Sequence, residues 1–226
     1  MKLIGAPLSP FIRKVRIVAA EKGIAYDFDP SIGPMTMPDS YTDIHPLRRI
    51  PALVVEEDNP RAIINDSSAI CAYFEKLEPT PSVYPSDSLQ FGRILWLEEF
   101  ADTGFAEQVG LGVFRPMFFN IAMQKEPDID TAQATLVKLR EGHFAYLESQ
   151  LGDGDWFGGD IMSVADISIG CNLINLMHVG YHLKPSDGAR LSAMFERFLS
   201  CPSVDSFVQK ERATLVKMGM AFPELK

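Results

Sequence analysis

Two short segments of this chain place polar side chains at the predicted start of a helix. Ser9 stands directly before Pro10, and serine at the N-cap with proline at the first helical position is a typical helix start. Asp66 and Ser67 stand before a second helical pattern. A helix N-terminus offers unpaired N–H groups and a partial positive charge, so each segment can hold an anion in addition to capping its helix. The Ser9 hydroxyl can also donate a hydrogen bond to that anion.

A pair of arginines lies between these two helix starts. Arg48 and Arg49 directly precede Ile50 and Pro51, and either guanidinium could pair with a carboxylate of a ligand. The alternative is a solvated charge pair on the surface.

Ser9 fits two other chemistries poorly. A hydrolytic serine needs the glycines of a nucleophile elbow and an oxyanion donor, whereas Leu8 and Pro10 flank Ser9 and proline has no N–H. A dithiol redox role needs C-x-x-C, which the chain lacks. The cysteines are three in number and far apart in the sequence, which predicts reduced thiols without disulfides or a metal site: Cys71, Cys171 and Cys201.

The elements that would position these residues differ between the two halves of the chain. Strands and helices alternate in the first 80 residues, and a long loop interrupts them. We expect strands at 2–5, 25–29, 52–56 and 62–64, helices at 11–22 and 67–77, a loop at 30–50 and a hairpin turn around 58–61. A proline-rich linker at 81–87 follows, and then only helical patterns, at 88–105, 131–151, 164–179, 187–199 and 204–218.

Composition limits the cell compartment and the partners. The 226 residues are 46% hydrophobic, which is enough for two small cores. No apolar run approaches the roughly 18 to 20 residues of a membrane span, and no signal-peptide pattern opens the chain. A formal net charge of −9 argues against nucleic acid as a partner. We therefore expect a soluble cytoplasmic protein with neither a nucleic-acid nor a membrane partner.

Three motifs, in this order and spacing, resemble those of cytosolic glutathione S-transferases. Ser9-Pro10-Phe11 opens S-P-F-x-R-K-V-R, Ile50-Pro51-Ala52-Leu53 matches x-I-P-A-L, and Asp66-Ser67 opens [ED]-S-x-A-I. Ser163 and Asp166 resemble the family's helix-capping box, to which we assign a role in folding alone. The resemblance implies a serine-type, bacterial-type member with an α/β plus all-α fold. A thioredoxin-like N-terminal domain (1–80) and a linker (81–87) would precede an all-helical C-terminal domain (88–226).

The resemblance also implies roles for individual residues. Ser9 would be the catalytic residue, donating a hydrogen bond from its hydroxyl to the thiolate of glutathione. A cis Pro51 would aim the backbone of Ile50 at the cysteinyl part. Asp66 stands where the family more often has Glu, and Arg49 matches the motif lysine better than Arg48 does. Glutathione would be bound as a substrate, without a metal, by Ser9, Phe11, Arg49, Ile50, Pro51, Asp66 and Ser67.

A second-substrate pocket is expected in the helical half. Phe114, Arg115 and Phe118 combine aromatic surface with one cation, which suits an apolar electrophile bearing a negative group, although core packing also explains the aromatic residues. The implied function is conjugation of glutathione to such an electrophile by a homodimer, in detoxification. The alternatives are a glutathione-dependent peroxidase, isomerase or dehalogenase, or a binding module without turnover.

Overall fold

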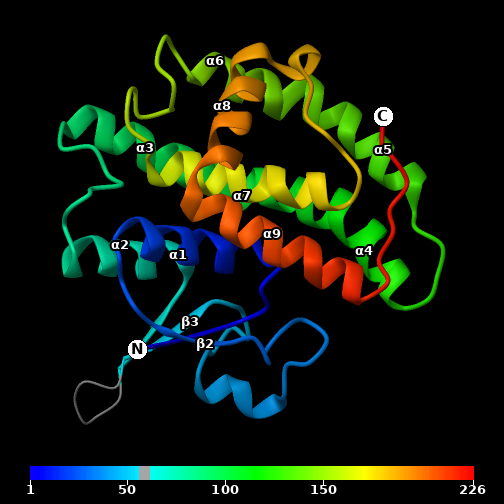
Figure 1. Ribbon diagram of the computed structural model, residues 1–226, viewed down its shortest axis with the longest axis horizontal. Helices are drawn as coiled ribbons and strands as arrows, with labels where there is room; N and C mark the ends of the chain where they lie inside the picture. Colours follow the sequence, from blue (N-terminus) through cyan, green and yellow to red (C-terminus); the bar gives the residue numbers. More distant parts are fainter. Residues whose placement is uncertain (56–61) are drawn as a thin grey trace. The chain divides into compact units, whose positions relative to one another are not determined.

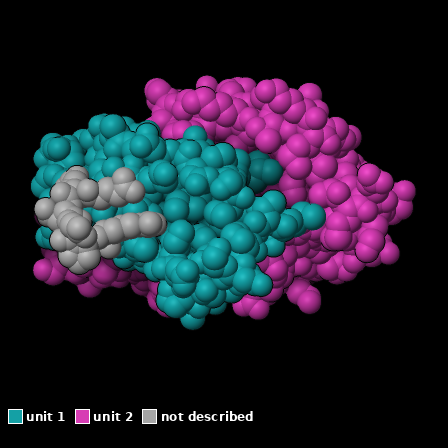
Figure 2. All heavy atoms as spheres, turned by 90° about the horizontal axis from the view of Figure 1, so that it is seen from below, with its two compact units in different colours: residues 1–83 teal, residues 84–226 magenta. Residues whose placement is uncertain are grey.

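The structure is a computed structural model that describes residues 1–55 and 62–226. It divides into two compact units, Met1–Val83 and Tyr84–Lys226, which Figure 2 colours separately. The boundary falls inside the segment 81–87, the expected linker. The expected turn at Asp58-Asn59-Pro60-Arg61, and Glu56 at the end of the preceding strand, lie outside the described residues.

A four-stranded mixed sheet forms the centre of the first unit (Figure 1). Its strands, in the order β2-β1-β3-β4, are β1 (Lys2–Ile4), β2 (Asp27–Asp29), β3 (Ala52–Val55) and β4 (Ala62–Asn65). β1 runs parallel to β2, whereas β3 runs antiparallel to both β1 and β4. With helix α1 between β1 and β2 and helix α2 after β4, this arrangement confirms the predicted thioredoxin-like fold. β2 is shorter than expected, and β4 extends to Asn65.

The two helices of this unit begin where the sequence predicts. α1 (Pro10–Glu21) has Ser9 as its N-cap and proline in its first turn, and it ends before Gly23, which adopts a positive φ of 64°. α2 (Ser67–Leu77) has Asp66 as its N-cap. The helices pack against each other, and α1 buries its apolar face, which includes Ile12 and Val15.

The expected loop at 30–50 contains a short 3₁₀ helix, η1 (Asp39–Asp43). Tyr41, in this helix, is 2% exposed and packs in a cluster with Ile4, Ala52 and Val54 of the sheet. Tyr41 therefore fixes the loop to the core of the sheet. The Pro- and Met-rich composition of the loop did not predict this contact.

The second unit is built from helices joined by loops. The α-helices are α3 (Ser88–Phe100), α4 (Arg115–Ala122), α5 (Ile129–Lys138), α6 (Ala145–Gln150), α7 (Val164–His178), α8 (Ala189–Ser200) and α9 (Pro202–Lys217). Three π-helical segments connect these helices. The first, η2 (Ala101–Phe105), continues α3, the second, η3 (Gln108–Phe114), leads into α4, and the third, η4 (Leu139–Phe144), joins α5 to α6. A 3₁₀ turn, η5 (Pro185–Asp187), precedes α8. The all-helical prediction is confirmed, and α7, α8 and α9 begin and end within two residues of the expected positions.

α4 was not among the predicted helices. Gly110 and Gly112 interrupt the pattern before it and Pro116 lies in its first turn, so the local sequence is typical of a break. Proline is tolerated there because the N–H groups of a first turn have no helical partner.

α7, yellow in Figure 1, is the core of the second unit. All 15 of its residues are buried, and it packs against α3, α8 and the π-helical segments η2 and η3. At its start Asp166 accepts hydrogen bonds from Ser163 N at 2.8 Å, Ser163 Oγ at 2.6 Å and Phe157 N at 2.8 Å. Burial raises the pKa of the Asp166 carboxyl to about 6. Within the described residues, no helix has the length and apolarity to cross a bilayer.

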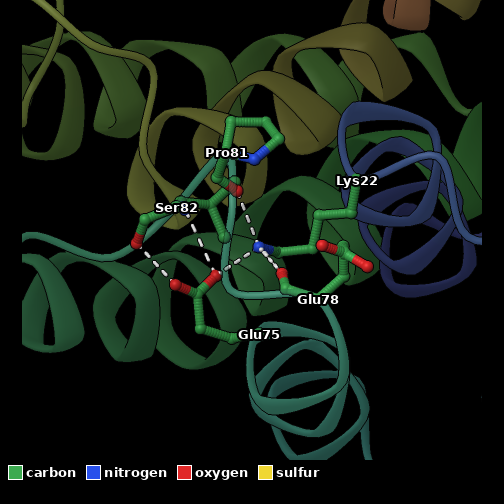
Figure 3. A network of polar contacts seen from close by, with 6 residues as sticks. Lys22, Glu75, Glu78, Pro81 and Ser82 are labelled. Carbon is green, nitrogen blue, oxygen red and sulfur yellow. Dashed lines mark hydrogen bonds and ion pairs between the residues drawn. The ribbon is translucent and has the colours of Figure 1, made fainter.

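A buried lysine joins the ends of α1 and α2 to the chain that follows them (Figure 3). Lys22 Nζ lies 2.6 Å from Glu75 Oε2 and donates to the carbonyl oxygens of Glu78 and Pro81 at 2.8 and 2.7 Å. Ser82 Oγ donates to the other oxygen of Glu75 at 2.5 Å. The Lys22 side chain is 0% exposed, and these three acceptors match the three protons of its ammonium group.

We predict that Lys22→Met destabilises the protein by about 3 to 5 kcal/mol. Methionine fills similar space but removes the cation paired with Glu75 and the donor of two carbonyl groups, while Glu75 keeps its bonds from Ser82 Oγ and Val83 N. Lys76→Met is the matched control, because Lys76 is exposed in the last turn of α2 and should change stability by less than about 0.5 kcal/mol. Urea unfolding of both variants measures the difference, and equal losses would contradict the role of the network.

Candidate functional site

The sheet register brings three predicted motifs to one edge of the first unit. Ile4 pairs with Ala52, and Ala52 pairs with Asn65, so the residues just after β1, just before β3 and just after β4 are neighbours. We call this the site edge: residues 5–9, 49–51 and 66–67. Both helix N-termini of the unit open there, because α1 follows β1 and α2 follows β4.

Gly5 makes the close approach at the site edge possible. Its φ is +149°, and a Cβ atom there would lie 2.3 Å from Ile12 Cδ1 and 3.0 Å from Ile50 Cβ. A second link joins the two helix starts, since Lys14 Nζ donates to Ser68 Oγ at 2.9 Å. The geometry of the edge therefore depends on the absence of a side chain at Gly5 and on the long side chain of Lys14.

Ser9 caps α1 only weakly through its side chain. The distance from Ile12 N to Ser9 Oγ is 3.5 Å, at the outer limit for a hydrogen bond. The backbone of Ser9 is better fixed, because Ser9 N donates to Ala6 O at 3.1 Å. Within the part of the chain that the structure describes, the hydroxyl proton of Ser9 has no acceptor. The half-buried hydroxyl can therefore donate to a group placed at the helix start.

Asp66 uses one carboxylate oxygen to cap α2. Oδ1 accepts from Ser68 N at 2.8 Å and from Ala69 N at 3.3 Å, and Asp66 has a positive φ of 84°. The predicted capping role is confirmed, and two N–H groups of this helix start are already bonded within the chain. An anion at this end would use the remaining groups around Ser67, which is 2% exposed.

The two arginines have different surroundings. Arg48 pairs with Asp39 at 2.9 Å and also donates to the carbonyl oxygens of Met37 and Asp39 at 3.4 Å. Arg49 is exposed and, among the described residues, has no hydrogen bond or ion pair. Arg48 therefore holds the loop at 30–50, whereas the guanidinium of Arg49 is available to a ligand.

His45 is a neighbour of the site edge that was not among the predicted site residues. Its ring is buried, stacks on Tyr41 and accepts a hydrogen bond at Nδ1 from Leu47 N at 3.2 Å. Burial, followed by the positive charge of Arg49, lowers the pKa of His45, while Asp66 acts in the opposite direction. The charges of both Arg49 and Asp66 therefore affect the pKa of the His45 ring. No pattern in the sequence singled out His45.

The remaining predicted glutathione-binding residues also lie at or beside this edge. The Ile50–Pro51 peptide bond is cis, as the resemblance implied. Pro51 is buried just before β3, Ile50 is half-buried, and Phe11 is half-buried in the first turn of α1. Within the described ranges, no three His, Cys, Asp or Glu side chains come together as metal ligands.

In the second unit, the residues predicted to hold a second substrate lie around the start of α4. The rings of Phe114 and Phe118 stack at 5.0 Å with an interplanar angle of 12°, and both are less than a tenth exposed. Phe119 meets Phe118 edge to face at 5.3 Å. Most of the surface of both rings is therefore packed within the unit, and Arg115, adjacent in sequence, is an exposed cation.

Comparisons with known proteins agree with this architecture. The family model of the glutathione S-transferase N-terminal domain matches residues 3–82, and that of the C-terminal domain matches residues 130–197. An uncharacterized GST-like protein of Escherichia coli (strain K12), YibF, is 30% identical over 174 residues, which cover 76% of this chain and 79% of the relative. FtsZ-localized protein A of Caulobacter vibrioides is 26% identical over 175 residues, with 77% and 76% covered.

A solved structure shows the same fold. The crystal structure of a glutathione S-transferase from Rhodospirillum rubrum F11 matches with a TM-score of 0.78 and 24% identity, covering 91% of this chain and 90% of that one. Both domain models match at the expected places, and the Escherichia coli relative reaches 30% identity over most of its length. The chain therefore belongs to the glutathione S-transferase family.

Proposed function

We propose that this protein is a cytoplasmic glutathione transferase that joins the glutathione thiolate to a small apolar electrophile, with Ser9 as its catalytic residue. One observation carries the proposal. At the start of α1, Ser9 has a hydroxyl proton with no acceptor in the described part of the chain, at the same edge as the available cation of Arg49.

The energetics are compatible with such a role for Ser9. A free thiol with a pKa of about 8.5 is only a few per cent ionised at pH 7, and lowering that pKa by two units takes about 2.7 kcal/mol. A hydrogen bond to a charged group contributes about 1.5 to 3 kcal/mol, and a helix N-terminus about 0.3 to 1 kcal/mol. Ser9 at the start of α1 can combine the two effects without itself losing a proton.

The other residues of the site edge would hold the rest of the tripeptide. The backbone of Ile50, before cis Pro51, would pair with the cysteinyl part, and Arg49 would bind a carboxylate. Ser67 would meet the γ-glutamyl carboxylate. Asp66 accepts both of its capping bonds at Oδ1, which leaves Oδ2 to accept from the γ-glutamyl amino group. Phe11 would pack beside the bound tripeptide.

The transfer itself needs little from the protein beyond the thiolate. The sulfur forms a bond to an electrophilic carbon, and in an aryl halide the halide leaves with its bonding pair. We assign the apolar body of the electrophile to the Phe114 and Phe118 stack and its negative group, or the charge that develops on it, to Arg115.

Ser9→Ala should raise the pKa of the bound thiol by about one to two units, because the sulfur loses a donor. The pH–rate profile with glutathione and 1-chloro-2,4-dinitrobenzene should shift upward accordingly, while calorimetry shows glutathione affinity within about twofold of the parent. Ser9→Thr, which keeps the hydroxyl, is the matched control, and its pH–rate profile should stay close to that of the parent. An unchanged profile in Ser9→Ala would remove Ser9 from the mechanism.

Arg49→Ala should weaken glutathione binding by about 1 to 3 kcal/mol, because a carboxylate loses its charged donor. Arg48→Ala is the control in the neighbouring position. Since Arg48 is engaged with Asp39, its loss should affect stability more than affinity. Calorimetry of both variants decides the assignment, which fails if Arg48→Ala has the larger effect on binding.

The same kinetic assay, run across aryl halides, enals and organic hydroperoxides, tests the second-substrate residues. Arg115→Ala and Phe118→Ala should change the order of preference among these substrates and leave glutathione affinity unchanged. Equal losses on every substrate would instead mean that the segment serves only to pack the helical unit.

We also propose that the protein is a homodimer. Leu89 and Trp96 of α3 are 80% and 53% exposed, and Phe91 and Leu95 add to the apolar surface of this helix. Light scattering at micromolar concentration should give twice the chain mass of 25.1 kDa, and Leu89→Asp should shift the equilibrium toward the monomer. A monomer mass for the parent would refute the proposal.

A second candidate function is a binding module without turnover. Similarity to FtsZ-localized protein A favours it, since that name states localisation with a partner protein and no reaction. Glutathione binding with no measurable rate on any of the electrophiles or hydroperoxides above would support the module. Peroxidase, isomerase or dehalogenase activity would keep the site as proposed and change only the second substrate.

A further inference from the structure

One histidine organises the turn that leads into the site edge. The chain from His45 to Arg48 forms a tight turn, in which Arg48 N donates to His45 O at 2.8 Å. Inside this turn Leu47 N donates to Nδ1 of the His45 ring at 3.2 Å, in the manner of an Asx turn. His45 N in turn donates to Tyr41 O at 2.9 Å. The backbone and the ring of one residue therefore set the direction in which the chain continues to Arg49.

Two neighbouring elements hold the ring and the turn in place. The His45 ring is 6% exposed and stacks on Tyr41 of η1, with 6.5 Å between the ring centroids and 25° between their planes. From the end of β4, Asn65 Nδ2 donates to Ile44 O at 3.1 Å. The turn is therefore attached both to η1 and to the strand that leads to α2. A displacement of the turn would move Arg49 relative to the start of α2.

The hydrogen bond from Leu47 requires a neutral His45 ring. Nδ1 accepts this bond, so the one N–H proton of the neutral ring lies on Nε2. A second proton would occupy Nδ1 and point at the N–H of Leu47, which is also a donor. Protonation of His45 must therefore break the bond inside the turn, and it places a second cation near Arg49.

The surroundings of the ring favour its neutral form. Burial and the positive charge of Arg49 lower the pKa of His45, and the Asp66 carboxylate opposes them with a smaller effect. Burial raises the pKa of Tyr41 to about 12, so this neighbour stays uncharged. Because the folded chain holds His45 below its ordinary pKa of about 6.5, the turn is intact above that pH. It is lost as the pH falls through the lowered pKa.

We propose that His45 is a positioning residue of the glutathione site, whose neutral ring holds the turn that presents Arg49 and Ile50 to the tripeptide. This inference rests on the proposed function, because that function assigns Arg49 and Ile50 to glutathione. His45 acts through the turn and not on the ligand or the sulfur. Protonation of its ring therefore weakens glutathione binding and leaves the chemistry at Ser9 unchanged.

S-hexylglutathione is the probe for this proposal, because its blocked thiol cannot titrate. Calorimetry on the full chain between pH 7.5 and 5.0 should give a Kd that rises as the pH falls. The rise should approach about tenfold per pH unit below the pKa of His45, the limit for one coupled proton. His45→Asn keeps an acceptor for Leu47 N but cannot titrate, so it should bind like the parent at pH 7.5 and lose this pH dependence. His182→Asn is the control, because His182 is an exposed histidine of the second unit, and this variant should keep the pH dependence.

Kinetics at pH 7.5 separate positioning from catalysis. His45→Leu has no acceptor for Leu47 N, so it should raise KM for glutathione about fivefold, as expected for the loss of one hydrogen bond. Its kcat at saturating glutathione should stay within about twofold of the parent. The parent and His45→Asn decide the proposal even if His45→Leu does not fold.

Three results would overturn the role of His45 and leave the glutathione site standing. They are a parent Kd for S-hexylglutathione that is constant from pH 7.5 to 5.0, a His45→Asn variant that keeps the pH dependence of the parent, and a folded His45→Leu variant that loses kcat with KM unchanged. If the parent failed to bind S-hexylglutathione at every pH, the proposed glutathione site itself would be refuted, and the role of His45 with it.

Discussion

The candidate site depends first on the pairing of β3 with both of its neighbours. Ala52 faces Ile4 on one side and Asn65 on the other, and this row of three residues aligns the segments that follow β1, precede β3 and follow β4. Side chains alternate between the two faces of a strand, so a slip of one residue would turn Ile50, Pro51 and the start of α2 away from Ser9. Gly5 then allows the close contact with Ile50 that a larger residue would block.

Buried charged groups hold the irregular segments of both units. Lys22 donates to two carbonyl groups of the chain after α2 and pairs with Glu75, while Asp166 accepts from the backbone of Phe157 and Ser163 before α7. In each case backbone groups outside helices and sheet are bonded by one ionisable side chain. Such interactions stabilise a particular path of the chain, because their loss leaves several buried polar groups unsatisfied at once.

Availability distinguishes the residues proposed for function from those that support them. Arg48 and Arg49 are adjacent and chemically identical, yet Arg48 is used within the loop by Asp39 and Arg49 is not. Asp66 combines a supporting role with a proposed one, because its Oδ1 caps α2 and its Oδ2 is the atom we assign to the ligand. A charged group without an internal partner can bind an ion without breaking an ion pair that stabilises the fold.

The sequence alone determined the local features: both helix starts, the two-unit organisation with its all-helical second half, and the motifs that identify the family. These follow from short-range rules of capping, proline geometry and periodicity. Only the tertiary structure decided which arginine is available, that Tyr41 anchors the long loop, and that α4 forms beyond the glycines. It also decided that the C-terminal tail returns to Gly180. Each of these depends on residues distant in sequence, and no local pattern records which of them will meet.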